Sequence, residues 1–576
     1  APTKDVKVRA LYNARFPFAG KSIVMVSNGS KTYTVDFRKH RLISELEFQE
    51  GEDLLEANTQ QNAFAYLKGS NLYVRTFNAA PENAMTKEKK SHDFQLSADG
   101  SREIVYGQSV HRDEFGISKG TFWSPNGERL AFYRMDQSMV TDYPQVNIPE
   151  IGFDHPETQS CIATPAPDKY PMAGETSHQV TVGVFDCLTG KTIYLKAGDP
   201  TDRYFTNIAW SPDSKTVYMF EVNRDQNDSR LTAYDAETGE KTGELYRETD
   251  EKYVEPLHPI MFLPWDSNRF IMQSRKDGYN HLYLCTLGKH GSRMASNTES
   301  LDIRQLTSGK WEVMEVLGFN RKRKSIIIAS NECSPIQRNI FLVDTQTGKR
   351  TMMDDCGKGW HNATLSESGQ FVYDNYSTPD VPRKIAIVNT ENGKRTAYFT
   401  AENPWKGYNV PEYSCGTVKA ADGETDLYWR MVKPTNFDPA KKYPTIIYVY
   451  GGPHAHNVDA SWHWGSRSWE TYMAQKGYIL FILDNRGSEH RGKAFEQVTF
   501  RHLGDNEVAD QMEGVKYLKS LPYVDADRIG VHGWSFGGFM TINMMTTHPE
   551  VFKVGVAGGP VIDWKWYEVM YGERYM

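Results

Sequence analysis

The sequence lacks features that would place it in several large classes of proteins. No apolar run approaches the roughly 18–20 residues that a membrane-spanning helix needs. Its six cysteines lie far apart without a C-x-x-C pair, which argues against a zinc site. Basic residues are outnumbered, because 66 Lys and Arg against 73 Asp and Glu give a net charge of −7. This argues against a nucleic-acid partner, which requires a basic face. We therefore expect no membrane span, no nucleic-acid partner, no metal and no cofactor.

What the sequence does have is length. Its 576 residues exceed what a single hydrophobic core usually organises, so at least two domains are expected. The hydrophobic content of 39% and the charged content of 24% are ordinary for a globular protein.

A repeating unit runs from about residue 60 to residue 400. Each repeat has an aromatic or apolar residue, then a turn rich in Ser, Pro, Asp and Gly, then an apolar strand. These turns are Leu96–Gly100, Trp123–Gly127, Trp210–Ser214 and Leu365–Gly369. Polar hairpin turns lie between them, at Leu188–Lys191, Glu237–Glu240, Gln346–Lys349 and Glu391–Lys394. Repeats of roughly 45–55 residues with several short strands predict the blades of a β-propeller. An array of β-sandwiches is the alternative.

One segment, Asp142–His178, breaks this rhythm. It holds six prolines, which are rare inside strands, so we expect a surface excursion rather than a blade.

Near residue 405 the pattern changes to strands that alternate with helices. The expected strands are Asp426–Val432, Thr445–Tyr450, Tyr478–Leu483 and Arg528–His532, and the expected helices are Trp469–Lys476, Asn506–Leu521 and Phe539–Met545. This alternation predicts a parallel sheet whose ligands bind at the carboxyl edge. The sequence therefore predicts two domains, a β-propeller over residues 1–405 and an α/β domain with a doubly wound sheet over residues 406–576.

The segment Gly533–Gly538 has the pattern of a nucleophile elbow, G-x-S-x-G followed by a further glycine. It lies between the expected strand that ends at His532 and the expected helix that begins at Phe539. Strand, elbow and helix in this order predict that residues 406–576 are an α/β-hydrolase domain. In such an elbow the central residue, here Ser535, is the nucleophile. The backbone N–H of Phe536, at the start of the helix, would donate to the oxyanion.

Several longer motifs resemble the prolyl oligopeptidase family of serine peptidases, in its dipeptidyl peptidase IV branch. They are Arg112–Phe115, Tyr450–Pro453, Asp484–Ser488, the elbow itself and Trp564–Tyr575. Within that branch, Glu114–Ile117, Tyr170–Gly174 and Gly558–Trp564 are most similar to the bacterial prolyl tripeptidyl peptidases. The resemblance implies an eight-bladed propeller, peptide substrates with a free N-terminus, cleavage after proline, a periplasmic or secreted location and a possible homodimer.

The resemblance also assigns roles to individual residues. Tyr450 would be the second oxyanion donor. The pocket for the proline ring would be lined by Phe536, Val561, Trp564, Tyr567 and Tyr571. Tyr567 and Tyr571 are four residues apart, so on a helix they would share one face. A plain amphipathic helix would show the same spacing.

Two glutamates match the family's anchors for the peptide N-terminus. Glu114 matches the first anchor, and Glu568 matches the acidic position used by the tripeptidyl enzymes. Carboxylates suit this task because charge-assisted hydrogen bonds to an ammonium group are strong and directional. Asp113 stands where dipeptidyl peptidase IV commonly has a second glutamate, so the chain departs from the double-Glu pattern. The alternative is that all three are ordinary solvated acids.

The rest of the catalytic triad is not recognisable after Ser535. The fold places Asp and then His after the serine, yet only His548 and Asp563 follow, and no histidine follows Asp563. We expect the hydrolase domain to be truncated at its C-terminus, with the triad Asp and His beyond Met576. We also expect the first part of the propeller to be incomplete.

The leading functional prediction is a serine exopeptidase that releases Xaa-Xaa-Pro tripeptides, with release of Xaa-Pro dipeptides as the alternative. An endopeptidase or acylaminoacyl-type relative would not need Glu114 and Glu568. The competing class is a catalytically inactive scaffold that binds peptides. His454 and His456 lack a nearby carboxylate or cysteine partner in sequence, so we expect a loop beside the active site there rather than a metal site.

Overall fold

We describe a computed structural model of residues 14–16, 21–28, 31–77, 91–148, 162–288, 301–354 and 357–576. The chain divides into two compact units, and each is described by itself. The first comprises Ala1–Phe262, Leu287–Leu301 and Trp564–Arg574, and the second comprises Leu263–Thr286, Asp302–Asp563 and Tyr575–Met576. No helix in these described ranges is both long enough and apolar enough to cross a membrane.

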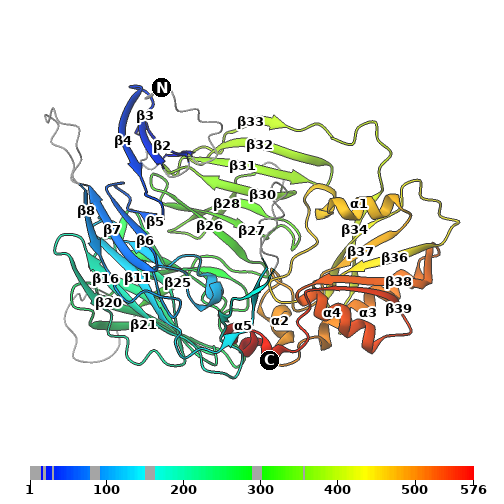
Figure 1. Cartoon of the computed structure of the whole chain (residues 1–576). Helices are drawn as coiled ribbons and strands as arrows, with labels where there is room; N and C mark the ends of the chain where they lie inside the picture. Colours follow the sequence, from blue (N-terminus) through cyan, green and yellow to red (C-terminus); the bar gives the residue numbers. More distant parts are fainter. Residues whose placement is uncertain are drawn as a thin grey trace. The chain divides into compact units, whose positions relative to one another are not determined.

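The first unit contains four antiparallel sheets that follow one another along the chain (Figure 1). The first sheet is β1(Ala14–Arg15), β2(Ile23–Asn28), β3(Lys31–Asp36) and β4(Arg41–Glu47). The second is β5(Glu52–Ala57), β6(Ala63–Lys68), β7(Asn71–Phe77) and β8(Ser91–Gln95). The third is β9(Ile104–Tyr106), β10(Thr121–Trp123), β11(Arg129–Asp136), β16(Gln179–Asp186) and β17(Lys191–Tyr194). The fourth is β18(Arg203–Trp210), β19(Thr216–Asn223), β20(Asp228–Asp235) and β21(Lys241–Thr249).

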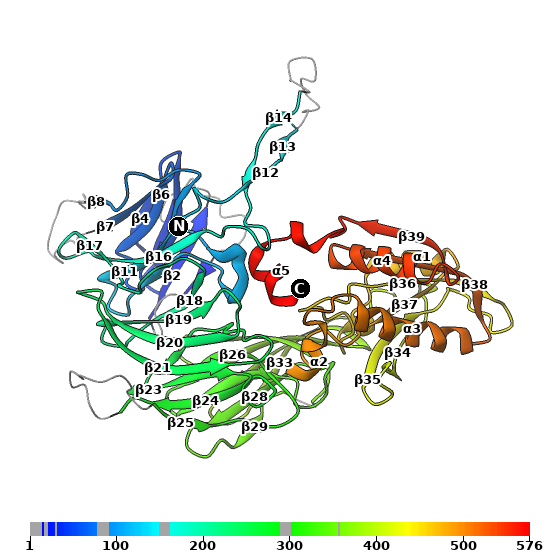
Figure 2. The ribbon, with the colours of Figure 1, turned by 90° about the horizontal axis from the view of Figure 1, so that it is seen from below.

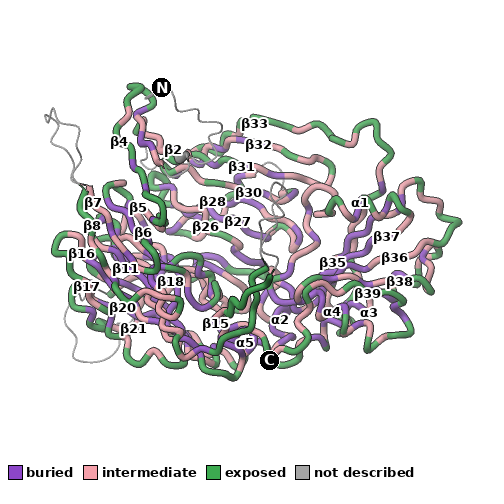
Figure 3. The backbone as a smooth tube through the Cα atoms, viewed as in Figure 1, coloured by how far each residue is buried: buried purple, intermediate pink, exposed green. Residues whose placement is uncertain are grey.

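The second unit continues this series with three sheets of the same kind. They are β22(Met261–Leu263), β23(Asp266–Ser274), β24(His281–Thr286) and β25(Asp302–Gln305); β26(Val313–Asn320), β27(Ser325–Ser330), β28(Asn339–Asp344) and β29(Arg350–Met352); and β30(Trp360–Leu365), β31(Phe371–Thr378), β32(Val381–Asn389) and β33(Arg395–Thr400). The middle strands are the most buried, as β27 illustrates, whereas the last strand β33 is largely exposed (Figure 3).

The predicted turns connect these strands as expected. Trp210–Ser214 joins the first and second strands of its sheet, and Ser211 Oγ accepts the N–H groups of Lys215 and Thr216. Leu188–Lys191 joins the third and fourth strands, where the Asp186 carboxylate accepts the next two free N–H groups along the turn. The same carboxylate-capped turn recurs at Asp235 and Asp344. Aspartate favours such turns because its short side chain reaches the backbone two residues ahead.

The apolar core lies between neighbouring sheets. Ala131, Tyr133 and Val182 of the third sheet pack in one buried cluster with Val217 and Tyr234 of the fourth. Clusters of the same kind join the second sheet to the third and the sixth to the seventh. Successive antiparallel sheets of four strands, or five in the third sheet, that share their cores in this way are propeller blades.

The proline-rich segment forms a narrow excursion from the third sheet. β12(Asp142–Tyr143) pairs with β15(Asp168–Lys169), and β13(Val146–Asn147) pairs with β14(Thr164–Pro165). Figure 2 shows this ladder projecting away from the blade that carries it. The prediction of an excursion is confirmed for its described part, while Pro149, Pro156 and Cys161 lie outside the described residues.

The hydrolase sheet in the second unit has six strands in the order β34-β35-β37-β36-β38-β39. Their bounds are β34(Tyr413–Lys419), β35(Asp426–Val432), β36(Tyr443–Tyr448), β37(Ile479–Leu483), β38(Val524–Trp534) and β39(Phe552–Gly558). The last four in this order are parallel, and β34 and β35 add an antiparallel edge. The predicted strands and the parallel core are confirmed.

Helices cover both faces of this sheet. α1(Ser468–Gln475) packs on one face, against Leu480 and Ile482, and α3(Asp505–Ser520) lies on the other, where Gly514 approaches Phe481 (Figure 1). α4(Phe536–Thr547) packs on the same side as α3. The remaining short helices are α2(Lys493–Glu496) and α5(Val569–Tyr575), with 3₁₀ turns η1(His111–Gly116), η3(Trp462–Gly465), η4(Gln497–Thr499) and η5(Trp564–Trp566).

Two expectations about the fold are not confirmed. The described residues form seven blades rather than eight, because the number eight came from the resemblance and not from counting turns in this sequence. A C-terminally truncated hydrolase domain is likewise not confirmed. The propeller strands end with β33 at Thr400 and the hydrolase sheet begins with β34 at Tyr413, but the compact units divide the chain elsewhere.

Candidate active site

Ser535 occupies a sharp turn between β38 and α4 in the second unit. Its backbone has φ 58° and ψ −116°, a conformation that a residue with a Cβ seldom adopts. Strain of this kind costs on the order of 1–3 kcal/mol and persists only where the surroundings hold it. The Ser535 N–H donates to the Gly558 carbonyl over 2.9 Å, which ties the turn to the end of β39.

The glycines around Ser535 are needed because backbone atoms crowd them. A Cβ on Gly533 would lie 2.2 Å from the Gly537 carbonyl oxygen, and one on Gly537 would lie 2.2 Å from the Val449 carbonyl oxygen. Both distances are far inside van der Waals contact. The predicted strand, elbow and helix are therefore present, with Ser535 at the carboxyl edge of the sheet.

Tyr450 follows the parallel strand β36 and meets Ser535 at this edge. Their hydroxyl groups hydrogen-bond, which lowers the pKa of Tyr450, while burial has the larger and opposite effect, so the pKa is raised overall. The phenol therefore stays protonated at neutral pH and can donate. Its ring lies 6.0 Å from that of Phe536, the first residue of α4, whose N-terminal end carries partial positive charge.

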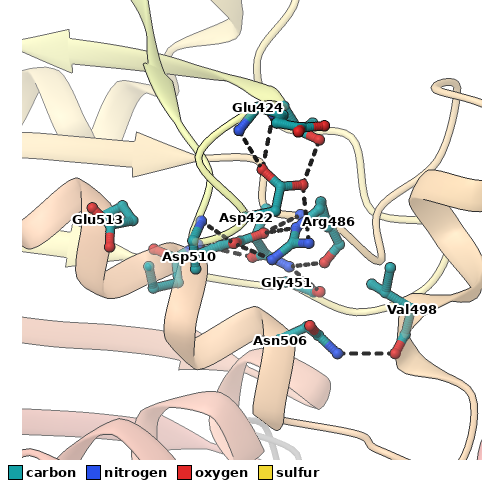
Figure 4. Close-up of polar contacts among 12 residues, drawn as sticks. Asp422, Glu424, Gly451, Arg486, Val498, Asn506, Asp510 and Glu513 are labelled. Carbon is teal, nitrogen blue, oxygen red and sulfur yellow. Dashed lines mark hydrogen bonds and ion pairs between the residues drawn. The ribbon is translucent and has the colours of Figure 1, made fainter.

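A buried polar network supports the loop that carries Tyr450. The Asn485 side-chain amide donates to the Gly451 carbonyl over 2.8 Å, and Gln511 donates to Asn485 Oδ1 over 2.9 Å. Beside it, Arg486 binds the Asp510 carboxylate with Nε and Nη2 at 2.9 and 2.8 Å, and Asp422 with Nη1 at 3.1 Å (Figure 4). These contacts fix the strand ends from which Tyr450 projects.

His548 is not placed to act as a base for Ser535. His548 follows the far end of α4, about 18 Å along a helix of twelve residues, and its Nδ1 lies 3.4 Å from Glu550. Asp563 follows β39 and carries no histidine after it in sequence. His548 is thus too far along the helix to accept a proton from Ser535.

The first unit brings together three of the predicted pocket residues. The Trp564 ring stacks on Tyr571 at 5.7 Å and 17°, and Tyr567 meets both rings edge-on at 5.6 and 5.2 Å. The expected shared helix face is wrong, because α5 begins at Val569, two residues after Tyr567. The rings meet through the turn between η5 and α5 instead. Val561 is half-buried and belongs to the second unit.

Glu114 lies in a cluster of carboxylates around one guanidinium in the first unit. Arg574 Nη1 lies 2.9 Å from Glu114 Oε2 and 2.9 Å from Glu255 Oε1, and Arg574 and Glu255 are almost fully buried. Gln226 Oε1 accepts Arg574 Nε over 2.8 Å. Asp113, in contrast, is exposed.

Glu568 belongs to the same cluster. Burial raises the pKa of its carboxyl to about 8, and the Glu114 charge adds to the effect. The carboxylate accepts the backbone N–H groups of Met570 and Tyr571 at 2.9 and 2.7 Å, which fixes its orientation. The two predicted anchors are therefore neighbours, although the sequence separates them widely.

Sequence reasoning missed two members of this cluster. Glu255 lies in a segment without a recognisable motif. Arg574 lies within the motif Trp564–Tyr575, but the sequence predicted no role for it. An arginine that is fully buried must have carboxylate partners, but neither its burial nor its partners can be read from local sequence.

The two histidines after Tyr450 bind neighbours within the second unit. His454 Nε2 and the Tyr575 hydroxyl are 3.2 Å apart, and its Nδ1 lies 3.6 Å from Glu489. His456 stacks on Trp360. No group of three or more His, Cys, Asp or Glu side chains in the described ranges is arranged to hold a metal ion.

A series of propeller blades joined to an α/β-hydrolase sheet that carries a nucleophile elbow defines the class of this protein. The family model for the dipeptidyl peptidase IV N-terminal region matches residues 20–383, and that for the prolyl oligopeptidase family matches residues 464–576. The chain belongs to the prolyl oligopeptidase family, in its dipeptidyl peptidase IV branch.

Solved structures agree with this assignment. A Bacteroides ovatus protein assigned as a dipeptidyl aminopeptidase IV is 50% identical, with a TM-score of 0.88 over 99% of this chain and 78% of that one. Dipeptidyl peptidase 4 of Porphyromonas gingivalis is 24% identical, with a TM-score of 0.78 over 98% and 75%, and shares the fold.

Curated relatives are longer than this chain. A protein of Talaromyces marneffei assigned as dipeptidyl-aminopeptidase B is 29% identical over 90% of this chain, which spans 57% of that relative's length. One of Aspergillus clavatus assigned as dipeptidyl peptidase 4 is 27% identical over 96% of this chain and 72% of its own length.

Proposed function

We propose that this protein is a serine exopeptidase that cleaves after proline and holds its substrates by their free amino terminus. The observation that carries the proposal is the cluster of Glu114, Glu568 and Arg574. This cluster brings two carboxyl groups together, and one of them is buried. The chain belongs to a family whose members carry a nucleophile elbow.

The cluster suits an ammonium ligand. Arg574 already has two carboxylate partners, Glu114 and Glu255, so a second cation would find acidic groups whose charge is not fully balanced. Glu568 holds its proton near neutral pH because its pKa is about 8. An arriving α-ammonium would favour the charged carboxylate, and binding would release that proton.

The chemistry would be acyl transfer through Ser535. Its hydroxyl would attack the carbonyl of proline, while the Tyr450 hydroxyl and the Phe536 N–H would donate to the oxyanion. The proline ring would lie against Trp564, Tyr567 and Tyr571, a set of rings that suits a rigid apolar side chain without an amide hydrogen.

The length of the released peptide has two candidates. The names of the relatives support dipeptides of the form Xaa-Pro. Two observations support Xaa-Xaa-Pro tripeptides instead. Glu114 is paired with Glu568. Asp113 is exposed and stands in place of the second glutamate of a double-Glu anchor.

The test uses the protein expressed from its complete reading frame, with chromogenic Gly-Pro and Ala-Ala-Pro substrates and their N-acetylated forms. We expect cleavage of a free-amine substrate and at least about tenfold weaker cleavage of its acetylated form. Glu114→Gln should raise KM for free amines, while Asp113→Asn, the matched control, should not. Equal cleavage of blocked and free substrates would indicate an endopeptidase, and no cleavage of any would indicate a binding scaffold.

A further inference from the structure

Glu114 lies in a backbone turn whose neighbouring residues have unfavourable φ values. Arg112, Asp113 and Phe115 all have left-handed φ values, of 54°, 65° and 58°, and His111 has φ 52°. Residues with a Cβ avoid this region, so packing from outside must impose the turn. Gly116 ends it, and a Cβ there would lie 2.2 Å from the Leu257 carbonyl oxygen.

The support on the N-terminal side of Glu114 is a buried pair of histidines. His111 Nδ1 and His178 Nε2 are 2.7 Å apart, and both side chains are buried. The backbone N–H of Phe205 donates to His111 Nε2 over 3.1 Å, so that nitrogen carries no proton. In neutral His111 the proton is therefore on Nδ1, which donates to Nε2 of His178.

This hydrogen bond requires that Nε2 of His178 carries no proton. The bond from Phe205 likewise requires that Nε2 of His111 carries none, so both rings must be neutral. Burial lowers the pKa of His178 to about 4, with a further effect from the charge of Arg112, and burial also lowers the pKa of His111. Tyr204, the other group packed against His111, meets it edge-on at 5.1 Å. The pair is thus neutral throughout the physiological pH range.

The support on the C-terminal side is Phe115. Its ring packs on Tyr204 at 5.4 Å and under the Arg574 guanidinium at 4.9 Å, and its carbonyl accepts Asn207 Nδ2 over 3.0 Å. Glu114 is therefore held between two buried residues, and Tyr204 contacts both of them. The His111 ring is oriented by two hydrogen bonds, one to the His178 side chain and one from the Phe205 backbone.

We propose that His178, acting through His111, is a positioning residue that sets the Glu114 carboxylate against Arg574 and so determines the preference for a free amino terminus. The inference rests on the proposed function, because it assigns His178 a role at the same amine anchor. His178 precedes β16 and does not itself belong to the carboxylate cluster. We therefore expect its side chain to act on substrate through the turn His111–Gly116, with which it shares the hydrogen bond to His111.

The experiment compares His178→Leu, which removes the acceptor, with His178→Gln, whose amide oxygen can still accept from His111. Leaving a buried donor unpaired costs enough to shift binding by about tenfold. We expect His178→Leu to raise KM for the free-amine substrate by about that factor, with kcat and the N-acetylated substrate little changed. His178→Gln should restore most of the loss. The amides of residues 112–116 should exchange faster in His178→Leu only.

His281→Leu is the matched control, since His281 is also fully buried and bonds Thr307 in another blade. It should lower the melting temperature without changing the ratio of free to blocked substrate. Should His178→Leu fail to fold, His178→Asn keeps an amide but withdraws the acceptor by one methylene, and the same KM shift is expected.

The outcomes separate the two proposals. A wild-type protein with no preference for free amines would overturn the proposed function. A preference that is intact in wild type and unchanged in His178→Leu or His178→Asn would overturn the positioning role alone. So would a loss of kcat in place of a rise in KM.

Discussion

The side-chain amide of Asn485 donates a 2.8 Å hydrogen bond to the carbonyl of Gly451, the residue that follows Tyr450. Gln511 fixes which way the Asn485 amide points, because its Nε2 donates to both Leu483 O and Asn485 Oδ1. The loop that carries Tyr450, which we propose as an oxyanion donor, is thus held by a side chain from outside that loop.

Replacing Asn485 with alanine should therefore lower kcat by about tenfold, since a buried carbonyl loses its donor and the Tyr450 loop can shift. KM should change little. Asn506→Ala, which removes a 3.0 Å bond to the Val498 carbonyl in the same region (Figure 4), is the control and should leave kcat unchanged. In a Tyr450→Phe background the Asn485 change should have no further effect, and a full additional loss would show that Asn485 acts elsewhere.

Tyr450→Phe keeps the ring against Phe536 but removes the hydroxyl that meets Ser535. Loss of one oxyanion donor costs on the order of 10²–10³ in kcat. We expect that loss in steady-state kinetics, with KM and the melting temperature close to wild type. A kcat within a few-fold of wild type would exclude the tyrosine as an oxyanion donor.

Binding of free-amine peptides should depend on the ionisation of Glu568. Its pKa of about 8 means that below pH 8 the site must release a proton before it can pair with an ammonium, so affinity should rise as pH approaches 8. Above that pH the peptide amine loses its own proton and affinity should fall. Calorimetry in buffers of different ionisation enthalpy should detect proton release at pH 7 for wild type. Glu568→Gln should release none, and equal release from both would assign the proton to another group.

Glu507 in α3 should make stability depend on pH. Burial raises the pKa of its carboxyl to about 8 in the folded state, against an ordinary value near 4.5 when unfolded. Between these values the Glu507 carboxyl keeps its proton in the folded state but has lost it in the unfolded chain. The contribution of this proton to the free energy of unfolding is therefore complete below about pH 4.5 and declines as pH rises through 8. Glu507→Gln should remove that decline.

Melting curves between pH 5 and pH 9 test this expectation, with the variant more stable at pH 9 by at least ~1 kcal/mol. Glu513→Gln, a change in the same helix at a residue with an exposed lysine partner, is the control. Parallel curves for wild type and Glu507→Gln would exclude Glu507 as the source.

The hydrolase half could be predicted well because its signals are local. The elbow around Ser535 needs glycines at fixed offsets, and the strand and helix that flank it have distinct apolar periods. Tyr450 could be placed because it ends a buried parallel strand, and parallel strands meet at one edge. The propeller turns could be predicted for the same reason, since Asp186 and Ser211 bind backbone groups within five residues.

The carboxylate cluster that we propose as the amine anchor could be predicted only in part. Glu114 and Glu568 were named from the resemblance, but Glu255 joins them through Arg574, and no local pattern connects these segments. The left-handed conformation of Phe115 accompanies its packing on Tyr204, a contact between segments that no local pattern predicts. The helix face expected for Tyr567 was wrong because α5 starts later than the spacing suggested.

The segment Trp564–Arg574 packs with the first unit although the residues on both sides of it belong to the second. The polypeptide therefore passes from one unit to the other and back within a dozen residues. An expression clone that stops at the end of the propeller strands would yield blades without Glu568 and Arg574. Producing this protein as two separate halves would thus divide the proposed anchor, and complementation between the halves would require the short segment to be supplied in trans.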